Sequence, residues 1–455
     1  MRKNNRSMLE GPLLSGIISY TIPIILTSIL QLLFNAADLV IVGQFRGSDA
    51  VAAVGATGAL TALIVNLFIG MSVGAGVTVA HGIGGKLNTT VHRTVHTTLP
   101  LSLVAGVFLT VVGIALSTPM LKMMGTDPDV LPLSSLYMKI YFGGITFTMV
   151  YNFCASILRA AGDTKSPLIF LTISGVVNVV LNVVFITIFN MNVDGVALAT
   201  VISQAISAIL VVIALMRRND ACRLELKKMR FYGKQLRKII SIGLPAGIQS
   251  SLFSISNVII QSSINSFGKI AMAGHAAAGN LDGFAYVTQN AFMQASINYI
   301  GQNSGAHQYA RVKKIYRTCL ALVTITGITV GGLMFLFKEP LLSIYLPNDP
   351  NAVKYGIIRL TYVCLPYFFC GLMEVTTGAL RGLGSSVTPM IVSILGICGV
   401  RIVWIFTIFK IPAYHTLKSL YISYPISWIA TFLFELFAFL YIYKKHVKAH
   451  KIITT

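Results

Sequence analysis

Twelve apolar segments recur along this chain, each long enough to cross a bilayer as an α-helix. A helix rises 1.5 Å per residue, so about 20 mostly apolar residues span the hydrocarbon core. The segments cover residues 13–35, 50–80, 95–117, 134–158, 166–188, 195–216, 239–264, 272–300, 318–337, 356–380, 387–409 and 419–443. The sequence therefore predicts an all-α integral membrane protein with twelve transmembrane helices.

The composition agrees with this class and excludes others. Of 455 residues, 55% are hydrophobic and 11% are charged, which is not a soluble balance. The net charge of +21 would suggest nucleic acid in a soluble protein, but the basic residues lie between apolar segments and form no patch. We expect a lipid bilayer as surroundings and no nucleic-acid partner. The six cysteines are scattered without ligand-like spacing, so we expect neither a metal site nor a cofactor.

Lysine and arginine set the orientation, because they are retained on the cytoplasmic side. With the N-terminus inside, 25 of the 35 basic residues lie on inner segments, including Arg2, Lys3 and Arg6 in the N-terminal tail. The inner stretch 217–238 is the most basic. We predict a cytoplasmic-membrane protein with both termini in the cytoplasm, and we expect a monomer.

The two halves of the chain are related in sequence. LRAAGDTKSP at 158–167 corresponds to LRGLGSSVTP at 380–389, and the same offset of 222 pairs Pro23 with Pro245 and Asp127 with Asp349. Six helices return the chain to its starting side, so the repeats are parallel. We predict two pseudo-symmetric six-helix bundles, 1–216 and 239–455, joined by a cytoplasmic connector at 217–238; the second ends in a short basic tail.

Several segments resemble the multidrug and toxic compound extrusion (MATE) transporters. They are YTIPIILTSILQLLFNAADLVIVGQF at 20–45, LRAAGDTKSP at 158–167, VDGVALATVIS at 193–203, IGLPAGIQSS at 242–251, IGQNSGAHQYARVKK at 300–314 and LRGLGSSVTP at 380–389. The resemblance spans nearly the whole chain. It implies two six-helix bundles, a central cavity, and export of organic, often cationic, compounds driven by protons or sodium ions.

The chain departs from the family pattern at two places. Sodium-coupled relatives commonly carry a carboxylate in the seventh helix, and residues 239–264 contain none. Where many relatives read LDP in the fifth helix, this chain reads Leu181-Asn182-Val183. The coupling ion, H⁺ or Na⁺, is left open by the sequence.

Three carboxylates are candidates for ion coupling: Asp282 and Glu374 within the apolar segments, and Asp38 just beyond the outer end of the first. Ionisable groups in a membrane are costly and are functional candidates by default. Asp38 occupies the aspartate of the matching family motif. Each has a structural alternative: Asp38 could order an outer loop, Asp282 needs a partner or water, and Glu374 could pair with Arg381. We expect Arg401 and Glu435 to form a buried pair that fixes helix packing.

Amide, aromatic and methionine side chains are candidates for binding substrate. Asn178 and Asn182 are four residues apart and share a helix face, as do Asn257 and Gln261. Polar strips next to aromatic rings suit amphipathic cations. Hydrogen bonding between helices is the alternative for each amide. The candidates are Gln31, Asn35, Tyr141, Asn152, Asn178, Asn182, Asn257, Gln261, Phe284 and Met293.

Backbone features suggest a hinge and a close helix contact. Pro23 lies inside the first predicted helix, where it removes a hydrogen bond and clashes with the carbonyl four residues earlier. We predict a hinge there. The glycine-rich stretch 70–86 lacks the GK[ST] ending of a phosphate loop, so it indicates close helix packing and an inner turn.

These features predict a secondary active multidrug efflux antiporter that works by alternating access. The alternative is a lipid-linked saccharide flippase of the same superfamily, which needs a strongly cationic cavity. A membrane enzyme would need converging His, Asp or Ser groups; the histidines lie mostly at inner turns or tails, and His275 stands alone in the sequence. We therefore predict no enzymatic activity. The substrate and the resting conformation are left open.

Overall fold

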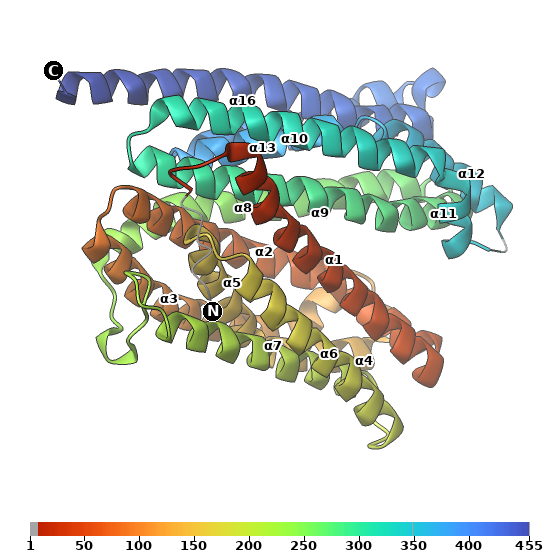
Figure 1. Cartoon of the computed structure of the whole chain (residues 1–455). Helices are drawn as coiled ribbons and strands as arrows, with labels where there is room; N and C mark the ends of the chain where they lie inside the picture. The colour runs from red at the N-terminus through yellow and green to blue at the C-terminus, as the bar shows by residue number, and fades with distance from the viewer. Residues whose placement is uncertain (1–7, 348, 455) are drawn as a thin grey trace. The chain divides into compact units, whose positions relative to one another are not determined.

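The computed structural model describes residues 8–347 and 349–454, apart from the side chains of residues 48, 59, 451, 453 and 454. Within this part the chain is helical throughout, and no strand occurs (Figure 1). The basic residues Arg2, Lys3 and Arg6 of the N-terminal tail lie outside the described residues. By its internal packing the described chain divides into two units.

The first unit holds Ile22–Gly247, and the second holds the described residues of Arg6–Thr21 and Ile248–Thr455. These units do not follow the repeat boundaries 1–216, 217–238 and 239–455. The first turns of α1 (Leu13–Arg46) pack with the second unit, and the first turns of α8 (Gly233–Asn265) pack with the first. The repeat domains remain a prediction about sequence, whereas the units describe packing.

The first unit contains six further helices. They are α2 (Ser48–Gly84), α3 (Asn88–Met123), α4 (Leu131–Gly143), α5 (Ile145–Ala160), α6 (Lys165–Thr187) and α7 (Val193–Met216). Helices α4 and α5 meet at a 48° bend and together form the predicted span 134–158. A short 3-10 turn, η1 (Leu226–Lys228), lies in the connector.

The second unit is more broken. Its helices are α9 (Lys269–Gly305), α10 (Tyr309–Leu336), α11 (Lys338–Tyr345), α12 (Pro350–Arg359), α13 (Tyr367–Gly382), α14 (Val387–Ser393), α15 (Val400–Phe406) and α16 (Leu417–Thr454). Two π-helical turns, η2 (Leu360–Cys364) and η3 (Ile394–Gly399), interrupt the predicted spans 356–380 and 387–409. Two 3-10 turns, η4 (Ile408–Lys410) and η5 (Pro412–Tyr414), precede α16.

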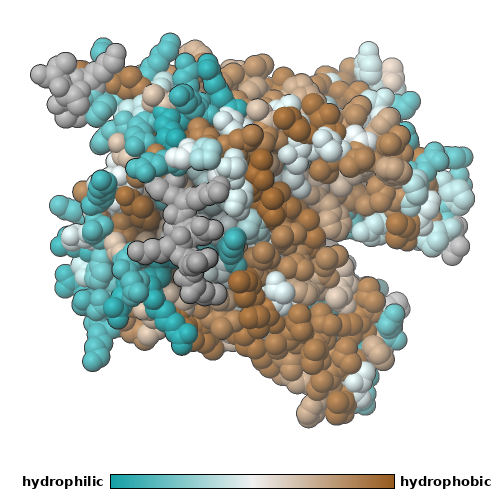
Figure 2. All heavy atoms as spheres, viewed as in Figure 1, coloured by the Kyte–Doolittle hydropathy of each residue, from teal (hydrophilic) through white to brown (hydrophobic). Residues whose placement is uncertain are grey.

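The membrane architecture predicted from sequence is confirmed. Among the described residues nine helices are long and apolar enough to cross a membrane, and two bent pairs raise this to eleven. Helix α9 is less apolar than these helices, but it runs for 37 residues through the predicted span 272–300. With α9 the described residues account for the twelve predicted spans. On the face in Figure 2, hydrophobic residues cover the sides of the helices and hydrophilic residues gather at helix ends.

The repeat is visible in the backbone as well as in the sequence. Gly162 and Gly384, which share the offset of 222, adopt φ angles of 88° and 90°. Such left-handed geometry is readily available only to glycine. Helices α5 and α13 end just before these glycines, at Ala160 and Gly382. The inner LRxxG turns are therefore the same structural element in both halves.

Glycines in the first unit produce the close helix packing expected of 70–86. A Cβ atom on Gly70 would lie 2.3 Å from the Cα of Gly247, and one on Gly74 would lie 2.1 Å from the carbonyl oxygen of Ile239. Neither atom would fit without moving the backbone of α8. The prediction of close packing is confirmed.

Candidate functional site

Asp38 lies in the first unit with its carboxylate buried among polar side chains. Helix α1 carries it, and only 8% of the residue is exposed. The side-chain amide of Asn182, on α6, donates a hydrogen bond of 2.5 Å to Asp38 Oδ1. Among the described residues, no lysine or arginine lies within ion-pair distance of Asp38.

The polar group continues from Asn182 along α6 and across to α7. Asn182 Nδ2 also lies 3.4 Å from Asn178 Oδ1, and Asn178 Nδ2 lies 3.5 Å from the Thr200 hydroxyl. The amide oxygen of Asn182 is buried without a hydrogen-bond partner in the described part of the chain. The face shared by Asn178 and Asn182, predicted from their spacing, is thus turned toward Asp38.

Tyrosines of α4 complete this group. The neutral Tyr137 lies near Asp38, and its ring stacks on Tyr141 at 6.4 Å between centroids. A buried carboxylate with one amide donor and no cation is unfavourable when charged. It can gain stability from a proton or a small cation. We call Asp38, Tyr137, Asn178, Asn182 and Thr200 the Asp38 group.

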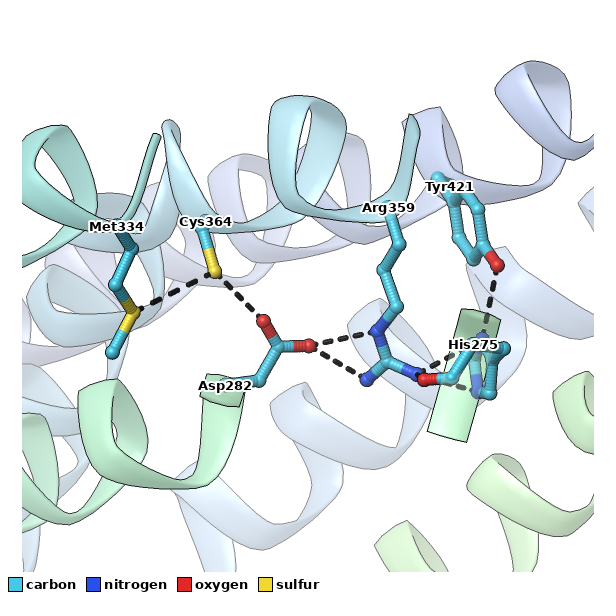
Figure 3. Close-up of polar contacts among 6 residues, drawn as sticks. All are labelled: His275, Asp282, Met334, Arg359, Cys364 and Tyr421. Atoms are coloured by element: carbon cyan, nitrogen blue, oxygen red, sulfur yellow. Dashed lines mark hydrogen bonds and ion pairs between the residues drawn. The ribbon is translucent and has the colours of Figure 1, made fainter. Parts of the chain in front are cut away.

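Asp282 lies in the second unit and, unlike Asp38, has a charged partner (Figure 3). Arg359, the last residue of α12, places Nε 2.8 Å and Nη2 2.7 Å from Asp282 Oδ2. The Cys364 thiol donates to the other carboxylate oxygen at 2.7 Å. Asp282 therefore holds both ends of the π-helical turn η2, which Arg359 precedes and Cys364 ends.

His275 extends this network rather than standing alone. Arg359 Nη1 lies 2.5 Å from His275 Nε2, and the Tyr421 hydroxyl lies 3.0 Å from His275 Nδ1. A guanidinium only donates hydrogen bonds, so the imidazole nitrogen that accepts from Arg359 must be unprotonated. Arg359 is thus the partner that a buried Asp282 was expected to need. A role of Asp282 in ion coupling stays a prediction.

Glu374 and Arg381 on α13 and Glu435 on α16 are buried in the second unit. Glu374 is 6% exposed and Glu435 fully buried, and the charge of Arg381 interacts with both. Glu435 accepts hydrogen bonds from the hydroxyls of Thr377 and Ser393 at 2.8 and 2.9 Å. Glu374 and Arg381, whose pairing is the structural alternative given above for Glu374, thus interact through their charges.

The expected pair between Arg401 and Glu435 is wrong. Arg401 donates to the Ser427 hydroxyl at 3.1 Å, and its guanidinium lies 4.1 Å from the centroid of the Tyr424 ring. Each residue bonds hydroxyl groups, and no ion pair joins the two among the described residues. Arg401 joins α15 to α16 by these contacts.

The remaining substrate candidates do not converge on one place within either unit. Gln31, Asn35 and Asn257 are exposed. Asn152 donates to its own helix at the Thr148 carbonyl, and Gln261 donates to Asn265. Met293 packs in the contact of α9 with α13, and Phe284 is half-buried. Their roles in binding substrate stay predictions, as does the hinge at Pro23, which does lie inside α1.

Sequence reasoning missed several polar partners. Arg359 lies inside the predicted span 356–380, and that position alone could have marked it as the partner of a buried acid. Tyr137, Thr200 and Ser393 gave no such signal, because hydroxyl residues are common in membrane helices. Only their neighbours in space distinguish them.

Comparison with known proteins agrees with this architecture. The chain is 26% identical over 437 residues to the probable multidrug resistance protein YoeA of Bacillus subtilis, covering 94% of this chain and 93% of the relative. It is 25% identical over 403 residues to the probable multidrug resistance protein NorM of Thermotoga maritima, covering 87% and 85%.

A solved structure shares the fold. A MOP superfamily transporter from Pyrococcus furiosus matches with a TM-score of 0.90 at 21% identity, covering 99% of both chains. The family model MatE matches residues 23–184 and 245–407, which lie in the two halves of the repeat. The resemblance seen in the sequence motifs is confirmed, and this chain belongs to the MatE family.

Proposed function

We propose that this protein is a secondary active antiporter that exports small organic, often cationic, compounds in exchange for protons or sodium ions by alternating access. The relatives reported above are described as probable multidrug resistance proteins, which supports the substrate class. The protein would lie in the cytoplasmic membrane with both termini inside. The basic connector 217–238 supports that orientation.

The observation that carries the proposal is the environment of Asp38. Its carboxylate is buried, accepts a hydrogen bond from Asn182 and lies beside the unpartnered amide oxygen of that residue. Burying a charge without a counter-ion is costly, so occupancy by a proton or a cation changes the stability of this packing. Such a change is what couples ion flow to movement of helices.

The prolines support a hinged movement. The division between the two units passes through α1 between Thr21 and Ile22, next to Pro23, and through α8 just after Gly247, two residues beyond Pro245. A proline inside a helix removes one backbone hydrogen bond and weakens it locally. Both helices therefore have a weak point at the place where one unit ends and the other begins.

Transport in proteoliposomes tests the proposal. Efflux of a fluorescent organic cation is measured with a proton gradient alone, with a sodium gradient alone and with neither. We expect one of the two gradients to drive efflux and Asp38→Asn to reduce it to the level without a gradient. Asp127→Asn is the matched control, because Asp127 is exposed and its carboxylate accepts a hydrogen bond from the nearby backbone N–H of Asp129.

Two results would contradict the proposal. Unchanged ion-driven efflux by Asp38→Asn would remove Asp38 from coupling. Movement of a lipid-linked saccharide precursor, with no transport of cations under either gradient, would favour the flippase instead.

A further inference from the structure

Glu435 lies on α16 in the interior of the second unit, at the end of a chain of hydrogen bonds. Thr377 Oγ1 lies 2.8 and 3.0 Å from its two carboxylate oxygens, and Ser393 Oγ donates to Oε1 at 2.9 Å. The Ser393 hydroxyl accepts from Gln249 Nε2 at 2.9 Å, and Gln249 Oε1 accepts from Arg381 Nη2 at 2.7 Å. The chain links α16, α14, α8 and α13.

The charges in this cluster do not balance. Two buried carboxylates, Glu374 and Glu435, face one guanidinium, that of Arg381. The charge of Arg381 reaches both, while its direct hydrogen bond goes to Gln249, and its Nε is buried without a partner. The other titratable neighbours are Tyr316, which faces Glu435, and Tyr286 and Cys370, which face Glu374; all three are neutral in ordinary conditions. One negative charge therefore lacks a counter-charge.

The fold itself does not require these polar groups. At the offset of 222, Ser393 corresponds to Leu171 and Thr377 to Ala155 in the first half, and both are buried. Glu435 itself corresponds to Ile213, which is 37% exposed, so apolar side chains occupy all three positions in the first half. Replacing buried ionic groups by apolar ones is often neutral or stabilising, so packing alone gives no reason for a carboxylate here.

We propose that Glu435 is a proton-binding site of the second unit, whose protonation changes the hydrogen bonding at the near end of the chain that leads to Arg381. On protonation the carboxylate becomes a carboxylic acid, and its new O–H donates to Ser393 Oγ. The Ser393 hydroxyl turns its own hydrogen to a carbonyl of its helix and still accepts from Gln249. The cluster then holds one negative and one positive charge, and it gains a net negative charge when the proton leaves.

The consequence for transport rests on the proposed antiport function. The chain includes Gln249, four residues after Pro245 in α8. Proton uptake at Glu435 changes the hydrogen bonding of Ser393, to which Gln249 donates one helical turn after the proline, so it can bias that helix. The second unit would then contribute a proton site of its own, in addition to the Asp38 group of the first unit.

Infrared spectroscopy tests proton binding without measuring transport. The full chain, in lipid nanodiscs, is titrated with pH while the C=O stretching band of protonated carboxyl groups is followed. Labelling with ¹³C-glutamate distinguishes glutamate from aspartate. We expect a label-sensitive band that disappears as pH rises and is missing in Glu435→Gln, an isosteric change that keeps an oxygen acceptor for Thr377.

Neighbouring threonines give a matched pair of variants. Thr377→Val removes a donor that stabilises the charged form, so the band should persist to higher pH by about one unit. Thr376→Val removes a hydroxyl that bonds the Tyr316 hydroxyl and not Glu435. It should leave the midpoint pH of the infrared band unchanged. These variants keep Glu435 in place, so they test the proposal even if Glu435→Gln does not fold.

Two outcomes would overturn the assignment. A label-sensitive band that survives in Glu435→Gln and is lost in Glu374→Gln would place the proton on Glu374. A wild-type spectrum without any titrating glutamate band would show that Glu435 neither takes up nor releases a proton in the pH range measured. Failure of proton-driven efflux would leave the infrared result intact, so the two proposals fail separately.

Discussion

The Asn182 amide donates its 2.5 Å hydrogen bond to an Asp38 carboxylate that has no cationic partner among the described residues. The two residues are 144 positions apart and lie on α1 and α6. The amide lets Asp38 remain the one carboxylate of its group.

Asn182→Asp should shift the dependence of transport on pH. Two carboxylates at hydrogen-bond distance cannot both be charged without a large cost, so they hold a shared proton to higher pH. We expect the pH profile of proton-driven efflux in proteoliposomes to move upward by about one unit or more. Asn190→Asp, on a loop where Asn190 binds Arg46, is the control. Superimposable profiles would contradict the prediction.

Arg359→Ala should strongly destabilise the protein. It leaves the buried carboxylate of Asp282 without a counter-charge, which costs about 3 to 5 kcal/mol. The double variant Asp282→Asn with Arg359→Gln removes both charges and should recover most of this loss. The free energy of unfolding in mixed micelles measures the effect. A loss no larger than that of Arg218→Gln, which breaks a more exposed ion pair, would show that the buried pair is not structural.

Gly70→Ala should lower stability because of a backbone clash. The added methyl group would lie 2.3 Å from Gly247 Cα, so α2 and α8 would have to separate in the first unit, at about 1 to 3 kcal/mol. Gly76→Ala on the same helix is the control, since its nearest neighbour would be 3.4 Å away. Thermal unfolding in detergent checks both. Equal melting temperatures for the two variants would argue against the close contact.

His96→Ala should release the connector from α3. His96 is fully buried, and its Nε2 accepts the backbone N–H of Glu225 at 3.0 Å. Losing the acceptor leaves that N–H unsatisfied, at about 1 to 3 kcal/mol. Limited proteolysis should then cut residues 217–232 at least several-fold faster. His92→Ala, which changes the partly exposed neighbour 3.9 Å from Glu225, should have a smaller effect; the reverse order would contradict this.

The Arg218–Asp220 pair should stabilise the connector only above acidic pH. Burial opposes ionisation, but the guanidinium of Arg218 holds the pKa of Asp220 below its usual range. A depressed pKa in the folded state gives stability that is present above the ordinary aspartate pKa and is lost as pH falls through the folded value. The pair is partly exposed, so Arg218→Gln should speed proteolysis of the connector at neutral pH by at most about fivefold. At low pH, the rates of proteolysis of Arg218→Gln and of the unaltered protein should become equal.

The helices and their order were predictable from sequence, because lipid demands long apolar segments that satisfy their own backbone. The repeat was also visible, since the glycine turns at Gly162 and Gly384 require particular residues. The break of one span into α12, η2 and α13 was not. It depends on Asp282 holding Arg359 and Cys364, and those contacts join residues 77 and 82 positions apart.

The sequence by itself determined the membrane class, the two related halves and the spacing that turns Asn178 and Asn182 to one face. Local rules decide these features, because helical periodicity and bilayer thickness act on neighbouring residues. Only the tertiary structure decided which buried acids are compensated. Asp282 has Arg359, Glu435 has hydroxyls instead of Arg401, and Asp38 has an amide. Electrostatic partnership depends on distances of a few ångströms between separate helices, and residue spacing along the chain does not encode them.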